Sequence, residues 1–190
     1  RRSSELPPDE EPEWHARRLV AQQCIYGVDK NPFAVNLAKL SIWLVTLARE
    51  HAFTFIDHAL KHGDSLVGLT RAQIRAFDWN ETAVPYFGPL YERVMRGLTS
   101  SMDYRRKLHD MGEGAYDRQE RVWRESEEAL ADARLVGDVC IAAFFGAEKD
   151  RARKELRDLY GTKVTAWRAT GANRAELEGI VEELRGGEKP

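Results

Sequence analysis

Apolar residues recur at helical spacing through the second half of the chain, beyond about residue 80. Four runs of this kind are marked by Tyr91, Val94 and Leu98; by Tyr116, Trp123, Leu130, Cys140 and Phe144; by Leu156, Leu159, Tyr160 and Trp167; and by Leu177, Ile180, Val181 and Leu184. Residues three or four apart share one face of an α-helix, so the spacing predicts four amphipathic helices. Chain reversals are expected at the glycines between or near the ends of these runs, which are Gly112, Gly114, Gly146, Gly161 and Gly171. The pattern therefore predicts an antiparallel helical bundle or a long helical hairpin.

The first 80 residues show a different pattern, in which short continuous apolar runs alternate with helical ones. Arg1–Pro12 is rich in Ser, Pro and acidic residues and is predicted to be a flexible lead-in. An amphipathic helix is predicted over Glu13–Gln23. Cys24–Val28 is too apolar to keep one face in water, which is typical of a strand in a parallel sheet that is covered on both sides. A short helix is expected at Arg71–Phe77.

One helix of the first half is apolar on almost every side. Asn31 and Pro32 predict its start, with Asn as the N-cap and Pro in the first turn, and the pattern continues to about Arg49. Its polar stripe is narrow, so we expect other parts of the protein to enclose it. Beyond it, Phe53–Leu60 and His62–Leu66 predict a second strand or extended segment with a turn at Gly63.

Two carboxylates follow the predicted strands. Asp29 comes directly after the first strand, and Asp64 comes after the second extended segment. The helix between them returns the chain to the same edge of the sheet by a right-handed crossover, so we expect both acids on one rim. Open α/β folds bind ligands at this carboxyl edge, where a rigidly held Asp can accept hydrogen bonds from two ribose hydroxyls.

The residues around these acids resemble a known family. The stretches IYGVDKNPFAVNLAKLSIWL and HGDSLVGL resemble the second and third motifs of class I S-adenosylmethionine-dependent DNA adenine methyltransferases, in particular those of large restriction-modification and phage-defence enzymes. The resemblance covers about residues 13–80. It implies that Asp29 holds the ribose of the S-adenosylmethionine cofactor and that Asp64 receives its adenine amino group. By the same resemblance, Lys30 and Ser65 line the adenine slot.

The resemblance also implies a fold and a division of the chain. The expected fold class is mainly α with a small α/β part, in which about two parallel strands from a Rossmann-like methyltransferase sheet are followed by the antiparallel helical bundle. Residues 1–12 form the lead-in, 13–80 a partial cofactor-binding core, and 81–190 a helical insertion. In the large defence methylases, such an insertion commonly separates the third motif from the catalytic motif.

Two further motifs of that family do not occur in these 190 residues. They are the Gly-rich first motif, which opens the methionine side of the cofactor site, and the Asn-Pro-Pro-aromatic motif, which grips a flipped-out adenine. The stretch at 84–87 shares only a Pro and aromatic residues with the second of these. The resemblance therefore implies a fragment of a DNA (adenine-N6) methyltransferase that has no catalytic residue of its own, is inactive alone, and meets DNA only through the full-length enzyme.

Composition narrows the choice of partner and compartment. The 29 basic and 31 acidic side chains nearly cancel, so no overall field draws the chain to nucleic acid or anionic lipid. The most apolar stretch is shorter than the roughly 20 residues that span a membrane, so we expect no membrane partner. Cys24 and Cys140 lie in segments that look buried and lack the spacing of a zinc site or a disulfide framework, which favours a reducing, cytoplasmic setting.

Simpler roles compete for the same residues. Asp29 is also placed to cap the following helix, and Asp64 to bond its own backbone in a turn. His58 and His62 are four residues apart with Asp57 nearby, but this spacing does not share a face in an extended segment, and no third ligand is evident. We therefore expect no metal site.

The best local basic cluster is Arg105–Lys107, and Arg118, Arg121 and Arg124 lie along one face of the long helix. Such arginines are able to touch DNA phosphates. Glutamates alternate with them, however, and ion pairs along a solvated helix face are the simpler interpretation.

Two other functions are carried as alternatives. One is a non-catalytic helical module that docks a partner, contacts DNA or self-associates, and it predicts exposed apolar area along the long helix. The other is a nicotinamide dehydrogenase fragment, which also places an acid after a strand but gives no reason for the Gly-Asp-Ser-Leu stretch at 63–66.

Overall fold

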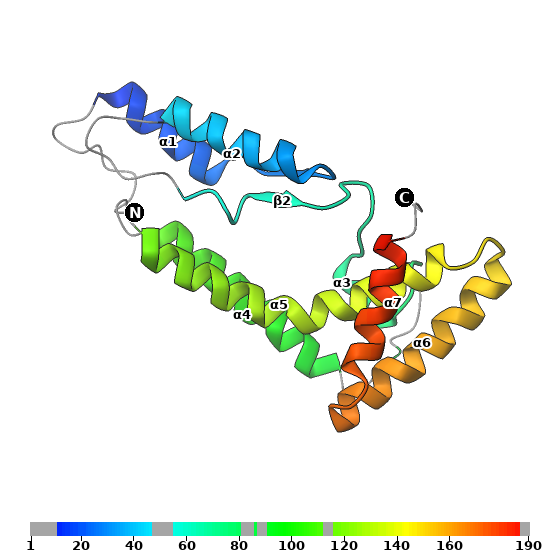
Figure 1. Ribbon diagram of the computed structural model, residues 1–190. Helices are drawn as coiled ribbons and strands as arrows, with labels where there is room; N and C mark the ends of the chain where they lie inside the picture. The colour runs from blue at the N-terminus through cyan, green and yellow to red at the C-terminus, as the bar shows by residue number, and fades with distance from the viewer. Residues whose placement is uncertain (1–10, 47–54, 81–85, 87–90, 112–115, 187–190) are drawn as a thin grey trace. The chain divides into compact units, whose positions relative to one another are not determined.

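The computed structural model describes residues 11–46, 55–80, 86, 91–111 and 116–186 (Figure 1). In order along the chain, its elements are α1 (Pro12–Gln23), β1 (Gly27–Asp29), α2 (Pro32–Thr46), β2 (Leu60–His62), α3 (Arg71–Ala76), α4 (Tyr91–Asp110), α5 (Tyr116–Phe145), α6 (Asp150–Thr170) and α7 (Arg174–Gly186). The described chain is mainly helical with one small parallel sheet, which confirms the predicted fold class at this level.

The helices lie where the hydrophobic pattern predicts them, although α4 continues to Asp110, well beyond Leu98, the last residue that marked it in the sequence. The predicted reversal at Gly161 is wrong, since this residue lies inside α6. A Cβ atom there would lie 2.9 Å from the ring of Tyr86, so glycine allows the ring to approach the helix closely. The predicted lead-in and the predicted helix end at Arg49 lie almost wholly outside the described residues.

Both strands are shorter than predicted. Only Gly27–Asp29 pairs in the first, so Asp29 is the last residue of the strand rather than the residue after it. Only Leu60–His62 pairs in the second, and the residues just before it turn, with the amide of Ala59 donating to the carbonyl of Ile56 at 3.0 Å. Apolar character marks a segment that can be buried, but strand length depends on how many backbone groups find a partner.

The pairing of β1 with β2 is parallel, and Gly27 and Asp29 stand opposite Leu60 and His62. Successive side chains of a strand point to opposite faces of the sheet. Leu60 therefore packs with Val35 and Ile56 under α2. Lys61 extends the other way to α5, where its ammonium lies 3.4 Å from the ring centroid of Trp123 and 3.4 Å from Glu127.

The chain forms two compact units that interleave along the sequence. Unit 1 comprises residues 1–67 and 100–128, and unit 2 comprises residues 68–99 and 129–190. Helices α4 and α5 therefore contribute residues to both units. Each unit is made of two separate segments of the chain, so this division does not test a single boundary at residue 80. The predicted domain boundary stays a prediction.

Unit 1 holds two small apolar clusters. One joins α2 to the segment that leads into β2, and the other joins Phe55 to Leu108 of α4 and Val122 of α5. Close by, the hydroxyls of Ser101 and Ser126 share a hydrogen bond of 2.8 Å between α4 and α5, and both side chains are buried. These contacts attach the end of α4 and the start of α5 to the sheet.

Unit 2 contains the largest apolar cluster, formed by Phe77, Ala133, Leu135, Val136, Val139, Cys140, Val164, Trp167, Leu177 and Val181. Phe77 ends α3 in a left-handed conformation, with φ of 48°, and its side chain is fully buried. The start of α3 is fixed by a capping box, in which Thr70 and Gln73 exchange side-chain and backbone hydrogen bonds. Burial of Cys140 is confirmed, but Cys24 is exposed.

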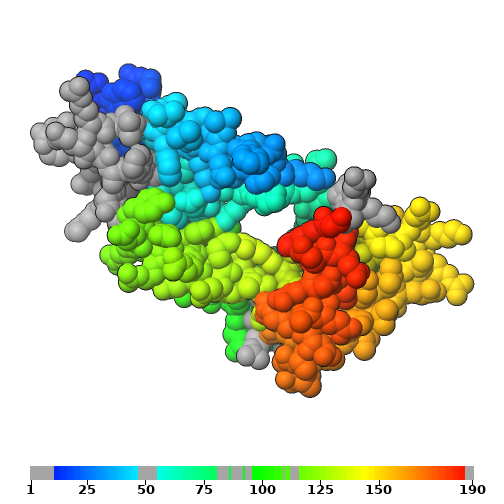
Figure 2. All heavy atoms as spheres, viewed as in Figure 1, coloured from blue at the N-terminus to red at the C-terminus, as the bar shows by residue number. Residues whose placement is uncertain are grey.

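Helix α2 is not enclosed, contrary to the prediction. Only Val35 and Thr46 are buried, and the exposed fractions of Phe33, Leu37, Leu40 and Leu44 are 81%, 64%, 49% and 65%. Atoms of α2 accordingly form part of the surface seen in Figure 2. Among the described residues, the helix is covered where α1, β1 and the segment at β2 pack against it, and its outer side has no described neighbour in unit 1.

The segment predicted as the first strand is also exposed to solvent. Tyr26 and Val28 have exposed fractions of 58% and 47%, so the prediction that both faces of this strand are covered is also wrong. The alternative of a helical interaction module predicts exposed apolar area along the long helix α5. No large apolar residue of α5 with a described side chain is exposed, and among the described residues the exposed large apolar side chains are most numerous on α2.

Candidate functional site

The parallel pairing of β1 and β2 places the ends of both strands at one edge of the sheet. Asp29 ends β1 directly opposite His62, which ends β2, and Asp64 follows two residues later. The amide of Gly63 donates to the carbonyl of Asp29 at 3.0 Å, so the two chain segments are still joined where they leave the sheet. The expectation that Asp29 and Asp64 leave the sheet at the same edge is therefore met.

The turn after β1 holds Asp29 in place. Its Oδ1 accepts a hydrogen bond of 2.7 Å from the amide of Asn31. Asn31 in turn accepts a bond of 2.9 Å from the amide of Phe33 through its own Oδ1, and so caps α2 as predicted. Asp29 thus fixes the turn that leads into the helix without being the cap itself. Both Asp29 and Lys30 are exposed.

The turn after β2 has the same construction. Oδ1 of Asp64 accepts a hydrogen bond of 2.8 Å from the amide of Leu66. Asp64 is partly buried, and Ser65 is exposed beside it. Nε2 of His62 lies 3.1 Å from the carbonyl oxygen of Lys30, which ties the second turn to the first. Asp64 therefore makes the turn bond that the simpler interpretation predicts, whereas Asp29 makes a turn bond in place of the predicted helix cap.

The four predicted site residues, Asp29, Lys30, Asp64 and Ser65, lie in these two neighbouring turns. In each acid only Oδ1 bonds to a residue that the structure describes. The turn therefore orients the carboxylate while the second oxygen stays available to a ligand. A carboxylate has about four acceptor positions, so the local bond and a ligand bond are compatible. The cofactor roles of all four residues stay predictions.

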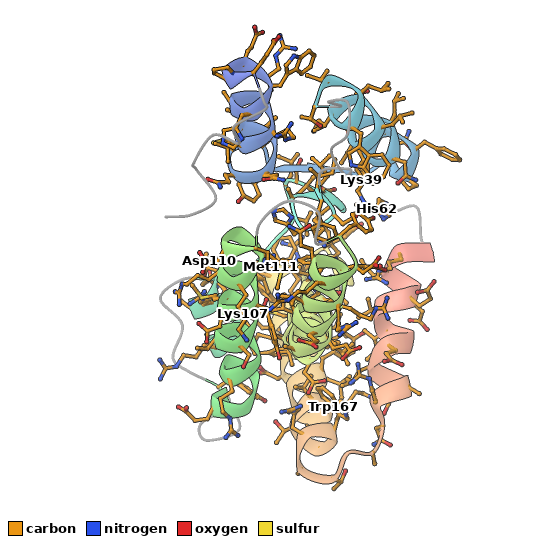
Figure 3. All side chains as sticks on the ribbon, turned by 90° about the vertical axis from the view of Figure 1, so that its left-hand side faces the viewer. Lys39, His62, Lys107, Asp110, Met111 and Trp167 are labelled. Atoms are coloured by element: carbon orange, nitrogen blue, oxygen red, sulfur yellow. The ribbon has the colours of Figure 1, made fainter. Side chains whose placement is uncertain are left out.

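A cavity of about 510 Å³ adjoins this edge on the α2 side of unit 1. It is lined in part by Lys39 and His62, both labelled in Figure 3, and by Asp57, Tyr116 and Trp123. Nζ of Lys39 lies 2.5 Å from Oδ1 of Asp57, and both side chains are largely shielded from solvent. Burial raises the pKa of the Tyr116 phenol, and the negative charge of Asp57 raises it further. The phenol is therefore neutral and able to donate.

Sequence reasoning missed this cavity. Its charged and aromatic residues come from α2, the segment before β2, and α5, and no local spacing relates them. The sequence pattern indicated Asp57 only as a neighbour of His58 and His62 in a possible metal site. One feature of the sequence could have indicated the cavity: Lys39 is the single charged residue of a largely apolar helix. A lysine that is shielded from solvent requires a counter-charge nearby.

The histidines at 58 and 62 do not converge. His58 stacks on Phe55 with ring centroids 5.8 Å apart, whereas His62 bonds to the Lys30 carbonyl at the end of the strand. Within the described ranges, no three His, Cys, Asp or Glu side chains are grouped so that they could hold a metal ion.

The basic residues of α4 and α5 form local ion pairs. Arg106 lies 3.2 Å from Asp103, and Arg124 lies 3.1 Å from Glu120, with all four side chains largely exposed. Pairs of this kind contribute about 0–1 kcal/mol and are weakened by salt. They fit the interpretation of a solvated helix face, and contact with DNA stays a prediction. None of the described helices is long and apolar enough to cross a membrane.

Comparison with known proteins adds one family match. The model of the family described as Eco57I restriction-modification methylase matches residues 23–117, which is half of the chain. The matched region includes β1, α2 and β2, and therefore both turns of the candidate site. No curated protein and no solved structure matches the chain.

Proposed function

The chain belongs to the Eco57I restriction-modification methylase family, and from this membership we propose that it is one part of an S-adenosylmethionine-dependent DNA adenine-N6 methyltransferase. The proposed setting is a restriction-modification or phage-defence system. One observation carries the proposal beyond the family: the parallel register of β1 and β2 brings Asp29 and Asp64 to one edge of the sheet. Ligands of open α/β folds bind at this edge.

We propose further that the strand-helix-strand unit at 27–62 belongs to a larger Rossmann-like sheet. Two parallel strands of three residues each cannot cover their own faces, and purely parallel sheets are normally covered on both sides. The exposed Val28 supports this interpretation, because a residue within a larger parallel sheet is normally covered. Other parts of the methylase would supply the neighbouring strands.

The chemistry of the edge fits the proposed cofactor. When bound, S-adenosylmethionine supplies the methyl group that is transferred. Asp29 is exposed and fixed by its turn, and its second oxygen can accept hydrogen bonds from ribose hydroxyls. Asp64 can accept a bond from an adenine amino group, with Lys30 and Ser65 flanking the same position. No residue of this chain is proposed to grip the target base, so that group has to come from another part of the methylase.

Replacement of each acid by its amide tests the cofactor role separately from the turn. Asn retains an oxygen that can accept the bond from the backbone amide, so Asp29→Asn and Asp64→Asn should keep both turns. In the complete methylase, we expect either change to weaken binding of S-adenosylhomocysteine by about 10- to 100-fold, because one charge-assisted hydrogen bond is lost. Isothermal titration calorimetry measures the affinity.

Asp103→Asn is the matched control, since Asp103 is an exposed acid on α4 that forms an ion pair with Arg106. It should leave the affinity unchanged. Titration with NAD in parallel tests the dehydrogenase alternative. Equal binding of S-adenosylhomocysteine by the parent and by Asp29→Asn would remove Asp29 from the cofactor site, and tight binding of NAD would replace the proposed cofactor.

A role in protein association is the second candidate. It is favoured by the exposed apolar residues of α2, which no ligand of the candidate edge would cover.

A further inference from the structure

His62 ends β2 on the side of the sheet that faces α2. Successive side chains of a strand alternate between the two faces, so His62 shares a face with Leu60, which packs under α2. From this position the ring of His62, labelled in Figure 3, contacts the turn that leads into α2. The proposed function gives His62 no role, although this contact joins the two turns of the candidate site.

The contact of His62 falls on a single peptide group. Its Nε2 lies 3.1 Å from the carbonyl oxygen of Lys30. A carbonyl oxygen can only accept, so Nε2 is the donor, as it can be both in neutral imidazole and in imidazolium. The other end of the same peptide is the amide of Asn31, which donates to Oδ1 of Asp29 at 2.7 Å. His62 and the Asp29 carboxylate therefore bind the two ends of one peptide group.

Hydrogen bonds at both ends fix the orientation of this peptide. Rotation of the Lys30–Asn31 peptide would carry its N–H away from Oδ1 of Asp29, and the bond from His62 opposes that rotation. The bond also polarises the carbonyl, which makes the N–H of the same peptide a stronger donor. Because β1 and β2 pair over only three residues each, the sheet by itself constrains the turn little.

We propose that His62 is a positioning residue for the cofactor site. It holds the Lys30–Asn31 peptide so that the Asp29 carboxylate presents its second oxygen in one direction to the ribose hydroxyls of S-adenosylmethionine. Its own backbone lies two residues before Asp64, so the same bond sets the turn at Asp29 relative to the turn at Asp64. The inference rests on the proposed function, because it requires that Asp29 binds the ribose.

Replacement of His62 tests the bond. His62→Leu removes the donor, and in the complete methylase it should weaken binding of S-adenosylhomocysteine by about 3- to 10-fold, the effect of one hydrogen bond. His62→Gln should recover most of the affinity, because its side-chain nitrogen can donate to the same carbonyl. Isothermal titration calorimetry measures both effects. A glutamine variant as weak as the leucine variant would overturn the role of the donor.

A double-mutant cycle tests whether His62 acts through Asp29. The variant Asp29→Ala has no carboxylate to orient, so adding His62→Leu to it should change the affinity by less than about twofold. A general loss of stability would instead act in both backgrounds. An effect of His62→Leu that is equally large with and without Asp29 would therefore overturn the inference.

Lys61→Leu is the matched control. It removes a polar group from the adjacent position of β2, where the side chain extends to the other face and contacts Trp123. It should lower the thermal stability of the methylase and leave the affinity for S-adenosylhomocysteine unchanged. A similar loss of affinity in Lys61→Leu and His62→Leu would show that any weakening of the strand is sufficient, and would remove the positioning role.

Nuclear magnetic resonance of the 190-residue chain tests the contact without the cofactor. Neutral His62 should carry its proton on Nε2, and the amide proton of Asn31 should shift in His62→Leu and return towards its parent position in His62→Gln. A neutral His62 protonated on Nδ1 would overturn the inference alone. Absence of S-adenosylhomocysteine binding by the parent methylase would instead overturn the proposed function, and the cofactor role of His62 with it.

Discussion

Asp29 and Asp64 each use one carboxylate oxygen to close the turn that follows their strand. A short side chain that is bonded to its own backbone has few conformations left, and its second oxygen keeps a fixed direction. The capping or turn role and the ligand role were opposed in the sequence interpretation. In the structure the first role supports the second, because a preoriented carboxylate loses less entropy when a ligand binds.

The two cysteines should differ sharply in reactivity. Cys24 is exposed, whereas Cys140 lies in the core of unit 2, where burial raises the pKa of its thiol to about 12. The thiolate is the reactive form, so Cys140 should stay inert up to at least about pH 9 in the folded chain. Titration with Ellman's reagent should count one thiol in the folded chain and two in denaturant.

The variant Cys24→Ser is the control for that count. It should release no chromophore until the chain is unfolded. Two rapidly reacting thiols in the folded parent would show that the buried position of Cys140 is wrong.

At the scale of the element, hydrophobic spacing was a good guide to helices and a poor one to strands. A helix makes its backbone bonds within itself, so its sequence determines where it begins and ends. A strand makes them with another segment, and the run Cys24–Val28 therefore says nothing of how many residues are paired. The apolar character of α2 likewise predicted burial, but burial depends on neighbours that the helix does not itself specify.

The candidate edge was predictable because its residues are local to two strand ends. The order strand, helix, strand brings Asp29 and Asp64 together whatever the details of packing. The cavity lined by Lys39, Asp57 and Tyr116 was not predictable, because it depends on where α5 packs. Chemistry that follows from topology could be inferred from the sequence, and chemistry that follows from tertiary packing could not.

Two helix glycines should respond in opposite ways to replacement by alanine. Gly97 lies in α4, where a Cβ atom would be 2.3 Å from the carbonyl oxygen of Ala129 in α5. That oxygen belongs to the backbone and cannot move aside cheaply, so Gly97→Ala should lower the free energy of unfolding by about 1–3 kcal/mol. Gly179 lies in α7 with open space around it, and Gly179→Ala should raise this free energy by about 0.5–1 kcal/mol.

Urea denaturation followed by circular dichroism measures both changes. Both variants gain the higher helix propensity of alanine, so the difference between Gly97→Ala and Gly179→Ala reports the steric effect at Gly97. A stabilising effect of Gly97→Ala would contradict the close approach of α4 to α5 at this position.

At the scale of the whole molecule, two motifs of DNA adenine methyltransferases are not found in this sequence. Neither the Gly-rich motif nor the Asn-Pro-Pro-aromatic motif occurs in the 190 residues. On the proposed function, other parts of the methylase supply these motifs, and we expect the isolated chain to bind S-adenosylhomocysteine weakly or not at all. Calorimetry on the isolated chain beside the complete methylase provides the comparison, and a micromolar affinity of the isolated chain would contradict the expectation.

The opposite orientations of Leu60 and Lys61 have a consequence for how this chain can change during evolution. A one-residue slip of this three-residue strand against β1 would exchange the two side chains, burying an ammonium beneath α2 and removing the cation from Trp123. Selection should therefore preserve the pairing register, whereas the connection from α2 to β2 can change in length without moving it.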